Sequence, residues 1–174
     1  FQANVNVARL IVKEVVERVA ARRPAVLFDV YGGVGVISLA CARSAGKVFG
    51  IEESPVAAQN AKRNRDLNHI ANAAFFEGQA EVILPELIQQ EHPEMIVVDP
   101  PRKGCEEKVL ALLAQTSATD LVYVSCNPVT LARDAKLLAG LGFSLEYVQP
   151  YDMFPQTFHI EAVAHITRTA AGVK

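Results

Sequence analysis

Residues 25–35 read Ala25-Val-Leu-Phe-Asp-Val-Tyr-Gly-Gly-Val-Gly35, and they determine the fold that we expect. The stretch from Ala25 to Val30 is typical of a buried strand, because it is mostly apolar and rich in β-branched residues. The glycine-rich stretch from Tyr31 to Gly35 predicts a tight turn, and a helix is expected from Val36 to about Arg43. Glycines in such a turn allow the backbone to approach a ligand without an intervening Cβ atom. A strand, a glycine turn and a helix in this order favour a nucleoside-type ligand.

The sequence around this turn alternates between helical and strand patterns. A helix is predicted for residues 5–22, with apolar side chains on one face and Pro24 behind it. Further strands are expected at 47–51, 73–77, 95–98, 120–124, 143–149 and 160–167, and further helices at 55–67, 81–90, 106–115 and 128–140. We therefore predict an α/β fold, a doubly wound Rossmann-like layer whose sheet is seven-stranded and mostly parallel. The last strands have no helix between them, which predicts an antiparallel last strand at one edge.

Composition narrows the functional classes. The chain has 174 residues, the size of one domain, and its net charge of −2 excludes a polybasic mode of gripping nucleic acid. No apolar run is long enough for a membrane span. Three cysteines, without metal-ligand spacing, suit a reducing cytoplasm and indicate no metal site. Because the chain begins at Phe1, we expect it to be a piece of a longer protein.

Polar residues follow several of the predicted strands. Ligands in doubly wound sheets bind at the carboxyl ends of the strands, which places the glycine turn, Glu52, Asp99 and Cys126 on one rim. A dinucleotide fingerprint needs glycine or alanine where Ser38 stands, so the turn fits a methyltransferase better than an NAD enzyme. Glu52 is placed to accept hydrogen bonds from ribose hydroxyls. The alternative is a plain turn, with Glu52 a solvated surface acid.

The three cysteines differ in their predicted positions. Cys41 lies in an apolar helix and is best interpreted as a buried hydrophobic residue, whereas Cys105 lies in a loop and fits either role. Cys126 comes at a strand end just before a helix, where the helix dipole and backbone N–H groups favour a thiolate. A nucleophile and an inert thiol at the rim are equally consistent with its position.

The loop at 153–161 brings further polar residues towards this rim. Glu161 is either a general base or an exposed strand acid, and His159 is either functional or a structural donor to backbone. Four basic residues lie on the same side: Arg102, Lys103, Arg133 and Lys136. They could bind a phosphate backbone, or they could be ordinary charged residues of the surface.

Three longer motifs carry a resemblance to a known family. Asp99-Pro-Pro-Arg-Lys-Gly104, Val124-Ser-Cys-Asn-Pro-Val-Thr-Leu-Ala-Arg-Asp134 and Asp152-Met-Phe-Pro-Gln-Thr-Phe-His-Ile-Glu161 resemble the signature motifs of the RNA 5-methyluridine (uracil-C5) methyltransferases. The opening Phe1-Gln-Ala-Asn4 is similar to the end of a further motif of that family. The resemblance covers the chain from Gln2 to about Ile166.

The resemblance implies a fold, a cofactor and a set of roles. Residues 1–174 would be a single catalytic domain of the class I methyltransferase type, without the N-terminal RNA-binding barrel and central domain that relatives carry. Cys126 would be the nucleophile and Glu161 the base. The S-adenosylmethionine site would be lined by Gln2, Tyr31, Gly33, Gly35, Glu52 and Asp99. The substrate would be RNA, 23S ribosomal RNA ahead of transfer RNA, with no obligate protein partner and no membrane.

Some positions depart from the common family pattern. Val36 stands where Thr or Asn often follows the turn, Gln79 where Asp or Asn often faces the adenine, and Gln156 where His is more usual. Candidates for stacking on a target base are Tyr31, Phe154 and Phe158, with core packing as the alternative for Phe154.

Other classes of protein remain as alternatives at this point. An NAD-type Rossmann oxidoreductase would share the fold, and a non-catalytic RNA-binding module could have kept it. A cytosine-5 methyltransferase would carry Cys beside the proline where this sequence has Arg102 after Pro101.

Overall fold

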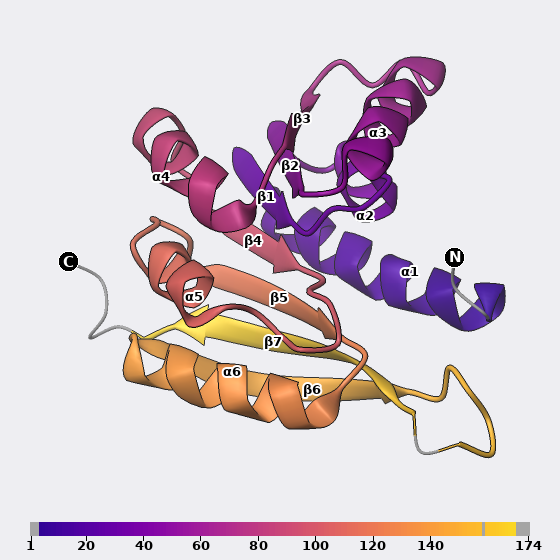
Figure 1. Cartoon of the computed structure of the whole chain (residues 1–174), viewed down its shortest axis with the longest axis vertical. Coiled ribbons are helices and arrows are strands. Elements are labelled where there is room, and N and C mark those ends of the chain that lie inside the picture. Colours follow the sequence, from indigo (N-terminus) through magenta and orange to yellow (C-terminus); the bar gives the residue numbers. More distant parts are fainter. Residues whose placement is uncertain (1–3, 158, 170–174) are drawn as a thin grey trace.

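A single sheet organises the molecule. The computed structural model describes residues 4–157 and 159–169. Its sheet is seven-stranded with the order β3-β2-β1-β4-β5-β7-β6, and helices cover both faces (Figure 1). The strands are β1 (Val26–Val30), β2 (Lys47–Glu52), β3 (Ala73–Glu77), β4 (Met95–Val98), β5 (Asp120–Ser125), β6 (Phe143–Tyr151) and β7 (Glu161–Arg168). The predicted fold class is therefore confirmed.

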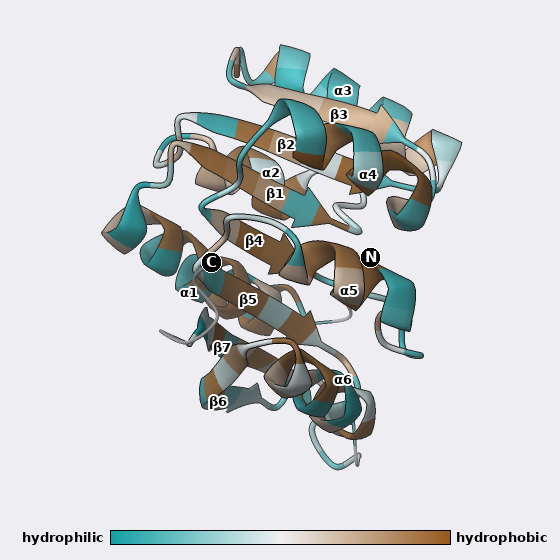
Figure 2. Cartoon of the chain, turned by 90° about the vertical axis from the view of Figure 1, so that its left-hand side faces the viewer, coloured by the Kyte–Doolittle hydropathy of each residue, from teal (hydrophilic) through white to brown (hydrophobic). Residues whose placement is uncertain are grey.

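Two apolar clusters fill the spaces between the sheet and its helices. The first face is covered by α1 (Val5–Arg22), α2 (Val36–Cys41) and α3 (Pro55–Leu67), and the second by α4 (Ala80–Gln90), α5 (Glu107–Ala114) and α6 (Pro128–Gly140). The central strands β4 and β5 are buried along their whole length, and β4 is hydrophobic throughout in Figure 2. Cys41 is fully buried in the first cluster, as predicted.

Helix starts follow the capping residues in the sequence. The Ser54 hydroxyl accepts a hydrogen bond from the Ala57 N–H at 3.4 Å, with Pro55 in the first turn of α3. The side chain of Asn127 caps α6 in the same way, accepting from the Val129 N–H at 3.1 Å. The helix α4 continues through Pro85, as expected.

The last two strands differ from the others in direction and in order. β7 lies between β5 and β6 and is antiparallel to both, so β6 forms the edge of the sheet. β6 extends through Pro150 to Tyr151, two residues beyond the predicted end at Gln149. An edge strand tolerates proline, because the side without a donor can face solvent. The reversed direction of β7 means that it begins where the parallel strands end.

The amino ends of the strands are held by charged side chains that are paired. Asp120, at the start of β5, is 4% exposed and accepts from Arg22 of α1 at 3.0 Å. The same oxygen lies 3.1 Å from Nε2 of His165 on β7. Arg168 donates to the carbonyls of Ala118 and Thr116, both at 2.9 Å. These contacts tie the first helix and the last strand to the centre of the sheet.

Candidate active site at the carboxyl ends of the strands

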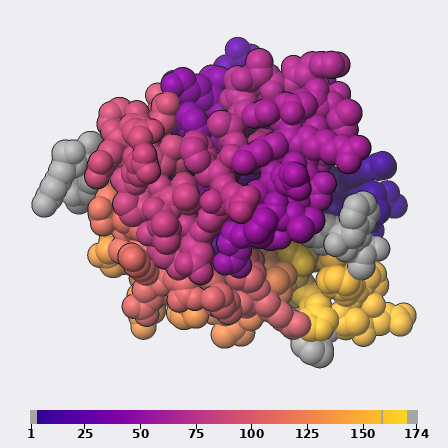
Figure 3. Space-filling model, turned by 45° about the horizontal axis from the view of Figure 1, so that its top comes forward, coloured from indigo at the N-terminus to yellow at the C-terminus, as the bar shows by residue number. Residues whose placement is uncertain are grey.

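The parallel strands all end on one rim, and most of the predicted site residues lie there. Tyr31 follows β1, Glu52 ends β2, Asp99 follows β4 and Cys126 follows β5. Glu161 is the first residue of β7, which runs in the opposite direction. The segment that leads into β7 projects at one corner of the molecule (Figure 3). Topology thus gathers residues that lie far apart in the sequence.

The glycine turn serves two different purposes. Gly33 has a φ of 55°, and a Cβ atom there would meet nothing within 4 Å, because the residue faces a pocket. Gly35 has a φ of 84°, and a Cβ atom there would lie 3.0 Å from the ring of Phe75. Gly33 is therefore placed to let a ligand approach the backbone, as predicted. Gly35 is required by packing, it does not line the pocket, and its cofactor contact stays a prediction.

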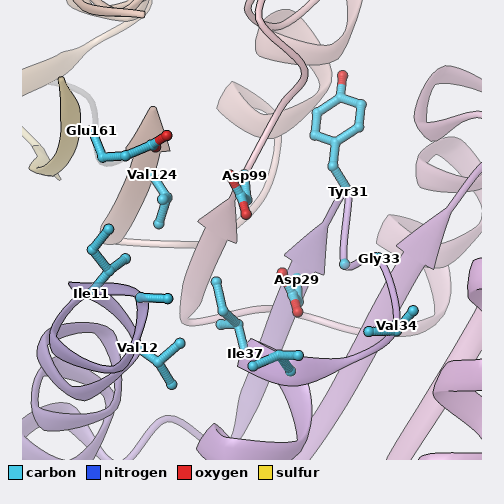
Figure 4. Close-up of a pocket in the computed structure, with 13 residues that line it drawn as sticks. Ile11, Val12, Asp29, Tyr31, Gly33, Val34, Ile37, Asp99, Val124 and Glu161 are labelled. Carbon is cyan, nitrogen blue, oxygen red and sulfur yellow. The ribbon is translucent and has the colours of Figure 1, made fainter. Parts of the chain in front are cut away.

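The pocket at the rim has a volume of about 200 Å³ and combines apolar walls with carboxylates. Ile11, Val12, Ile37 and Val124 contribute aliphatic side chains to its walls. Figure 4 shows Asp29, Asp99 and Glu161 with their carboxyl groups turned towards the same space. In the described part of the chain, none of these carboxyl groups forms an ion pair. Such a pocket favours a ligand that carries positive charge.

Burial and mutual repulsion change the acidity of these groups. Burial raises the pKa of Asp29 to about 6, although a hydrogen bond from the Ser38 hydroxyl opposes the shift. The pKa of Asp99 rises to about 7, because the group is desolvated and faces Asp29 and Glu161. One oxygen of Asp29 is buried without a hydrogen-bond partner among the described residues. An unpartnered buried oxygen indicates that this side of the pocket is suited to a hydrogen-bond donor.

Glu52 is held beside the glycine turn by backbone donors. Its Oε2 accepts from the Gly33 N–H at 3.0 Å and its Oε1 from the Ser54 N–H at 2.8 Å. Each carboxylate oxygen has a second lone pair, so the group can still accept from ribose hydroxyls. The position at the end of β2 agrees with the sequence prediction, and the ribose contact itself stays a prediction.

A second, smaller hollow adjoins the first through Tyr31. It has a volume of about 80 Å³ and is lined by Glu53 and by Gln79, the residue that we expected to face the adenine. Tyr31 lines both hollows and has a φ of 68°, in the left-handed region that favours glycine. A side chain held in this conformation at a strand end is typical of a functional site. The two hollows together are suited to an elongated ligand.

Cys126 and Glu161 face each other across two neighbouring strands. Ser125 of β5 and Ala162 of β7 form the last pair of the antiparallel ladder, and Cys126 and Glu161 are the residues next to this pair, close enough for the charge of Glu161 to raise the pKa of Cys126. Glu161 is only 8% exposed, which excludes the interpretation as an exposed strand acid. Cys126 is partly exposed at the rim, whereas Cys105 is buried. The predicted nucleophile and the predicted base are thus adjacent.

The acidity of Cys126 contradicts one expectation. The helix that follows was expected to favour the thiolate, but the pKa of Cys126 is raised. Desolvation is the main cause, and the negative charges of Glu161 and Asp99 add to it, outweighing the backbone hydrogen bond and Arg102 that lower it. Burial likewise raises the pKa of Glu161, which makes its carboxylate a stronger base.

The basic residues near the rim are engaged within the protein. Arg102 donates to Nδ1 of His159 at 2.9 Å. Arg133 pairs with Asp134 at 2.7 Å, and Lys103 pairs with Glu106 at 2.6 Å. Some of the basic residues that we expected to contact phosphate therefore form contacts within the protein instead.

Several predicted or unpredicted residues complete the picture. Phe154 packs against the first apolar cluster, which supports core packing. Gln2 and Phe158 lie outside the described residues. Asp29 and Asp134 were not among the predicted site residues, although Asp29 begins the D-x-x-x-G-x-G pattern of the glycine turn, which could have identified it. Among the described residues, no helix is long and apolar enough to cross a membrane, and no cluster of His, Cys, Asp and Glu could hold a metal.

A solved methyltransferase has a similar fold. A magnesium protoporphyrin IX methyltransferase from Synechocystis, solved with bound S-adenosylmethionine, superposes with a TM-score of 0.73. It is 15% identical and the match covers 94% of this chain and 80% of that one, so it shows the fold alone. The fold is that of the Rossmann-like methyltransferases.

Closer relatives define the family within this class. The tRNA (uracil-5-)-methyltransferase family matches residues 1–169, and the chain belongs to this family. An uncharacterised RNA methyltransferase of Clostridium acetobutylicum is 48% identical over 144 residues, 82% of this chain and 31% of the relative. One from Oceanobacillus iheyensis is 44% identical over 168 residues, 96% of this chain and 37% of the relative. This chain thus spans about a third of the length of these relatives.

A solved tRNA methyltransferase is similar to this chain in both sequence and structure. The tRNA (uracil-54, C5)-methyltransferase of Pyrococcus abyssi, in complex with S-adenosyl-L-homocysteine, has a TM-score of 0.81 and 30% sequence identity. The match covers 96% of this chain and 40% of that chain.

Proposed function

We propose that this chain is the catalytic part of an S-adenosylmethionine-dependent enzyme that methylates carbon 5 of uracil in RNA. The observation that carries the proposal is the position of Cys126 and Glu161 next to the last residue pair between β5 and β7, beside a pocket rich in carboxylates. An oxidoreductase that binds a dinucleotide has no need of this thiol and base. A non-catalytic RNA-binding module has no need of them either.

The residues of the pocket fit the cofactor. S-adenosylmethionine carries a sulfonium and an ammonium group, and Asp29, Asp99 and Glu161 offer negative charge to a ligand in the pocket. Glu52 would accept from the ribose, and the second hollow beside Tyr31 and Gln79 would take the adenine. When bound, the cofactor supplies an activated methyl group. The family and the cofactors in the solved relatives support the same ligand.

Cys126 would activate the target base. Carbon 5 of uracil is too weak a nucleophile to take a methyl group unaided. The thiolate of Cys126 bonds to carbon 6, the electron pair of the 5,6 double bond moves into an enolate, and carbon 5 becomes nucleophilic. Since the pKa of Cys126 is raised and the residue is partly exposed at the rim, the thiol would first lose its proton to solvent, which leaves Glu161 ionised for the later step.

Glu161 would complete the reaction. After methylation, carbon 5 carries both the methyl group and a proton. The carboxylate of Glu161 removes this proton, the electron pair restores the 5,6 double bond, and the bond between carbon 6 and sulfur breaks to release the Cys126 thiolate. Burial raises the pKa of Glu161 and so strengthens it as a base for this step.

The substrate must present an extruded uridine. A base inside a helix cannot reach Cys126, so we expect a loop or an opened helix. Methylation of 23S ribosomal RNA ahead of transfer RNA stays a prediction. The family and the Pyrococcus abyssi relative carry transfer RNA in their names, which keeps that substrate as the second candidate.

The deciding experiment maps 5-methyluridine in total RNA from cells with and without the gene for the whole protein. Loss of the modification at one position of 23S ribosomal RNA or transfer RNA would support the proposal and identify the substrate. An unchanged modification map, together with no methyl transfer from labelled S-adenosylmethionine to RNA from the deletion strain, would overturn it.

A further inference from the structure

The loop that follows β4 carries Asp99 to the pocket, and the first half of α6 holds its backbone. The carbonyl of Arg102 accepts from the Asn127 amide at 3.2 Å and from the Thr130 hydroxyl at 3.4 Å. Arg133 donates to the carbonyls of Lys103 at 3.0 Å and Cys105 at 3.1 Å. α6 is also the helix that starts directly after Cys126. One helix therefore fixes both the loop with Asp99 and the segment with the proposed nucleophile.

Asp134 is the centre of this arrangement. It is fully buried, and its Oδ2 accepts from the Cys105 N–H at 2.8 Å and from the Tyr123 hydroxyl at 2.6 Å. Its Oδ1 accepts from Arg133 Nε at 2.8 Å and from Arg133 Nη2 at 2.7 Å. A buried carboxylate with all of these donors has few ways to move, so it fixes the groups that it binds.

Gly104 shows how closely the loop and helix fit. It has a φ of 79°, and a Cβ atom there would lie 2.6 Å from Arg133 Nη2 and 2.6 Å from Asp134 Oδ2. The loop thus passes against the Arg133–Asp134 pair without room for a side chain. A displaced pair would shift the loop backbone itself, and with it Asp99, because the loop is short.

The arrangement also reaches the second side of the pocket. Tyr31 and Tyr123 both lie close enough to the Cys105 thiol to influence its pKa, which burial raises. Tyr31 lines both hollows, so Cys105 connects the buried carboxylate of Asp134 to a residue of the ligand site. Asp134 itself lines neither hollow.

We propose that Asp134, acting with Arg133 and Tyr123, is a positioning residue that sets the geometry of the cofactor site through the backbone of residues 102–105 and through Tyr31. This inference rests on the proposed function, because it presumes that the pocket binds S-adenosylmethionine. Asp134 touches neither cofactor nor RNA in this scheme.

The test compares two buried aspartates in the whole protein. Asp134→Asn and Asp120→Asn each remove a buried negative charge that is paired with an arginine, but Asp120 lies at the other end of the sheet. Both variants should unfold at lower temperature than the wild type. Calorimetric titration with S-adenosyl-L-homocysteine, well below both unfolding transitions, should give a Kd about tenfold higher for Asp134→Asn and unchanged for Asp120→Asn.

A second, more conservative variant tests the inference even if Asp134→Asn does not fold. Tyr123→Phe removes one donor to Asp134 and keeps the buried ring, and it should raise the Kd about threefold. Equal Kd values for wild type, Tyr123→Phe and a folded Asp134→Asn would overturn the inference, as would equal losses for Asp134→Asn and Asp120→Asn. If the wild type itself does not bind the ligand, the proposed function fails instead.

Discussion

The two ends of the sheet differ in whether their buried charged groups are paired. At the amino ends, Asp120 is paired with Arg22 and His165, and the Arg168 guanidinium is surrounded by carbonyl acceptors. At the carboxyl ends, the buried carboxyl groups around the pocket have no ion-pair partner in the described residues. One end is built for stability, since its charges satisfy one another. The other end holds electrostatic repulsion that a cationic ligand relieves.

Because the charges are paired at one end of the sheet and unpaired at the other, we expect substitutions at the two ends to change different properties of the protein. Substitutions of the unpaired carboxyl groups around the pocket should affect binding and chemistry and leave stability the same or higher. Substitutions at the amino ends should affect stability and leave binding unchanged. Sites that bind ligands often trade stability for function in this way.

Replacing Cys126 with Ala should have the largest effect. Without the sulfur no adduct with carbon 6 can form, so the rate of methyl transfer to RNA should fall by about a thousandfold or more. Filter binding of labelled methyl groups to RNA measures this rate. The Kd for S-adenosyl-L-homocysteine should stay within about twofold of the wild type, because Cys126 does not line the pocket. Turnover that survives the substitution would rule out the nucleophile.

Replacing Glu161 with Gln should separate charge from basicity. An amide cannot take the proton from carbon 5, so turnover should fall about a hundredfold or more and a covalent RNA–protein adduct should accumulate on denaturing gels. The same change removes a negative charge that raises the pKa of Cys126, so iodoacetamide should alkylate Cys126 faster at pH 8. Glu146→Gln, on the exposed edge strand, is the matched control. Normal turnover without an adduct would show that Glu161 is not the base.

The fold was predictable from the sequence because its signals are local. Ser54-Pro55 and Asn127-Pro128 mark helix starts that the structure confirms, and the apolar runs give each central strand. The placement of β7 between β5 and β6 was not predictable in this detail, because strand order depends on contacts between distant segments.

The residues of the site that belong to a sequence motif could be predicted. The properties that depend on burial, such as a pKa, could not. Cys126 and Glu161 were expected on one rim, and the antiparallel register places them in adjacent positions. The raised pKa of Cys126 was missed, because the sequence shows the helix that follows the thiol but neither the burial of the thiol nor the carboxylates that face it. Asp134 was hidden for the same reason: its donors come from residues 105, 123 and 133, which no local pattern connects.

Replacing Asp120 with Asn should lower the free energy of unfolding by about 2 kcal/mol, because a buried carboxylate loses its charged hydrogen bonds. Hydrogen exchange of the β5 amides in urea measures this change locally. Methyl transfer should proceed at the wild-type rate below the unfolding transition. A loss of turnover without loss of stability would break the separation between the two ends of the sheet.

Replacing Asp99 with Asn should have the opposite effect to replacing Asp120. It should stabilise the ligand-free protein and weaken the binding of the cofactor. The pKa of Asp99 is about 7 in the fold against 3.8 ordinarily, so the folded state keeps its proton where the unfolded state has lost it. The stability that this proton contributes is present below the ordinary pKa and is lost as pH rises towards and through 7. Asn cannot ionise, so the variant escapes the loss.

The measurement is a pair of unfolding curves. At pH 8 the ligand-free Asp99→Asn variant should unfold about 3 °C above the wild type, and at pH 4 the two should coincide. Its Kd for S-adenosylmethionine should rise more than its Kd for S-adenosyl-L-homocysteine, because only the former carries a sulfonium charge. A variant that is less stable than the wild type at pH 8 would mean that Asp99 is held by favourable contacts. The carboxyl ends of the strands would then not store the repulsion that distinguishes them from the amino ends.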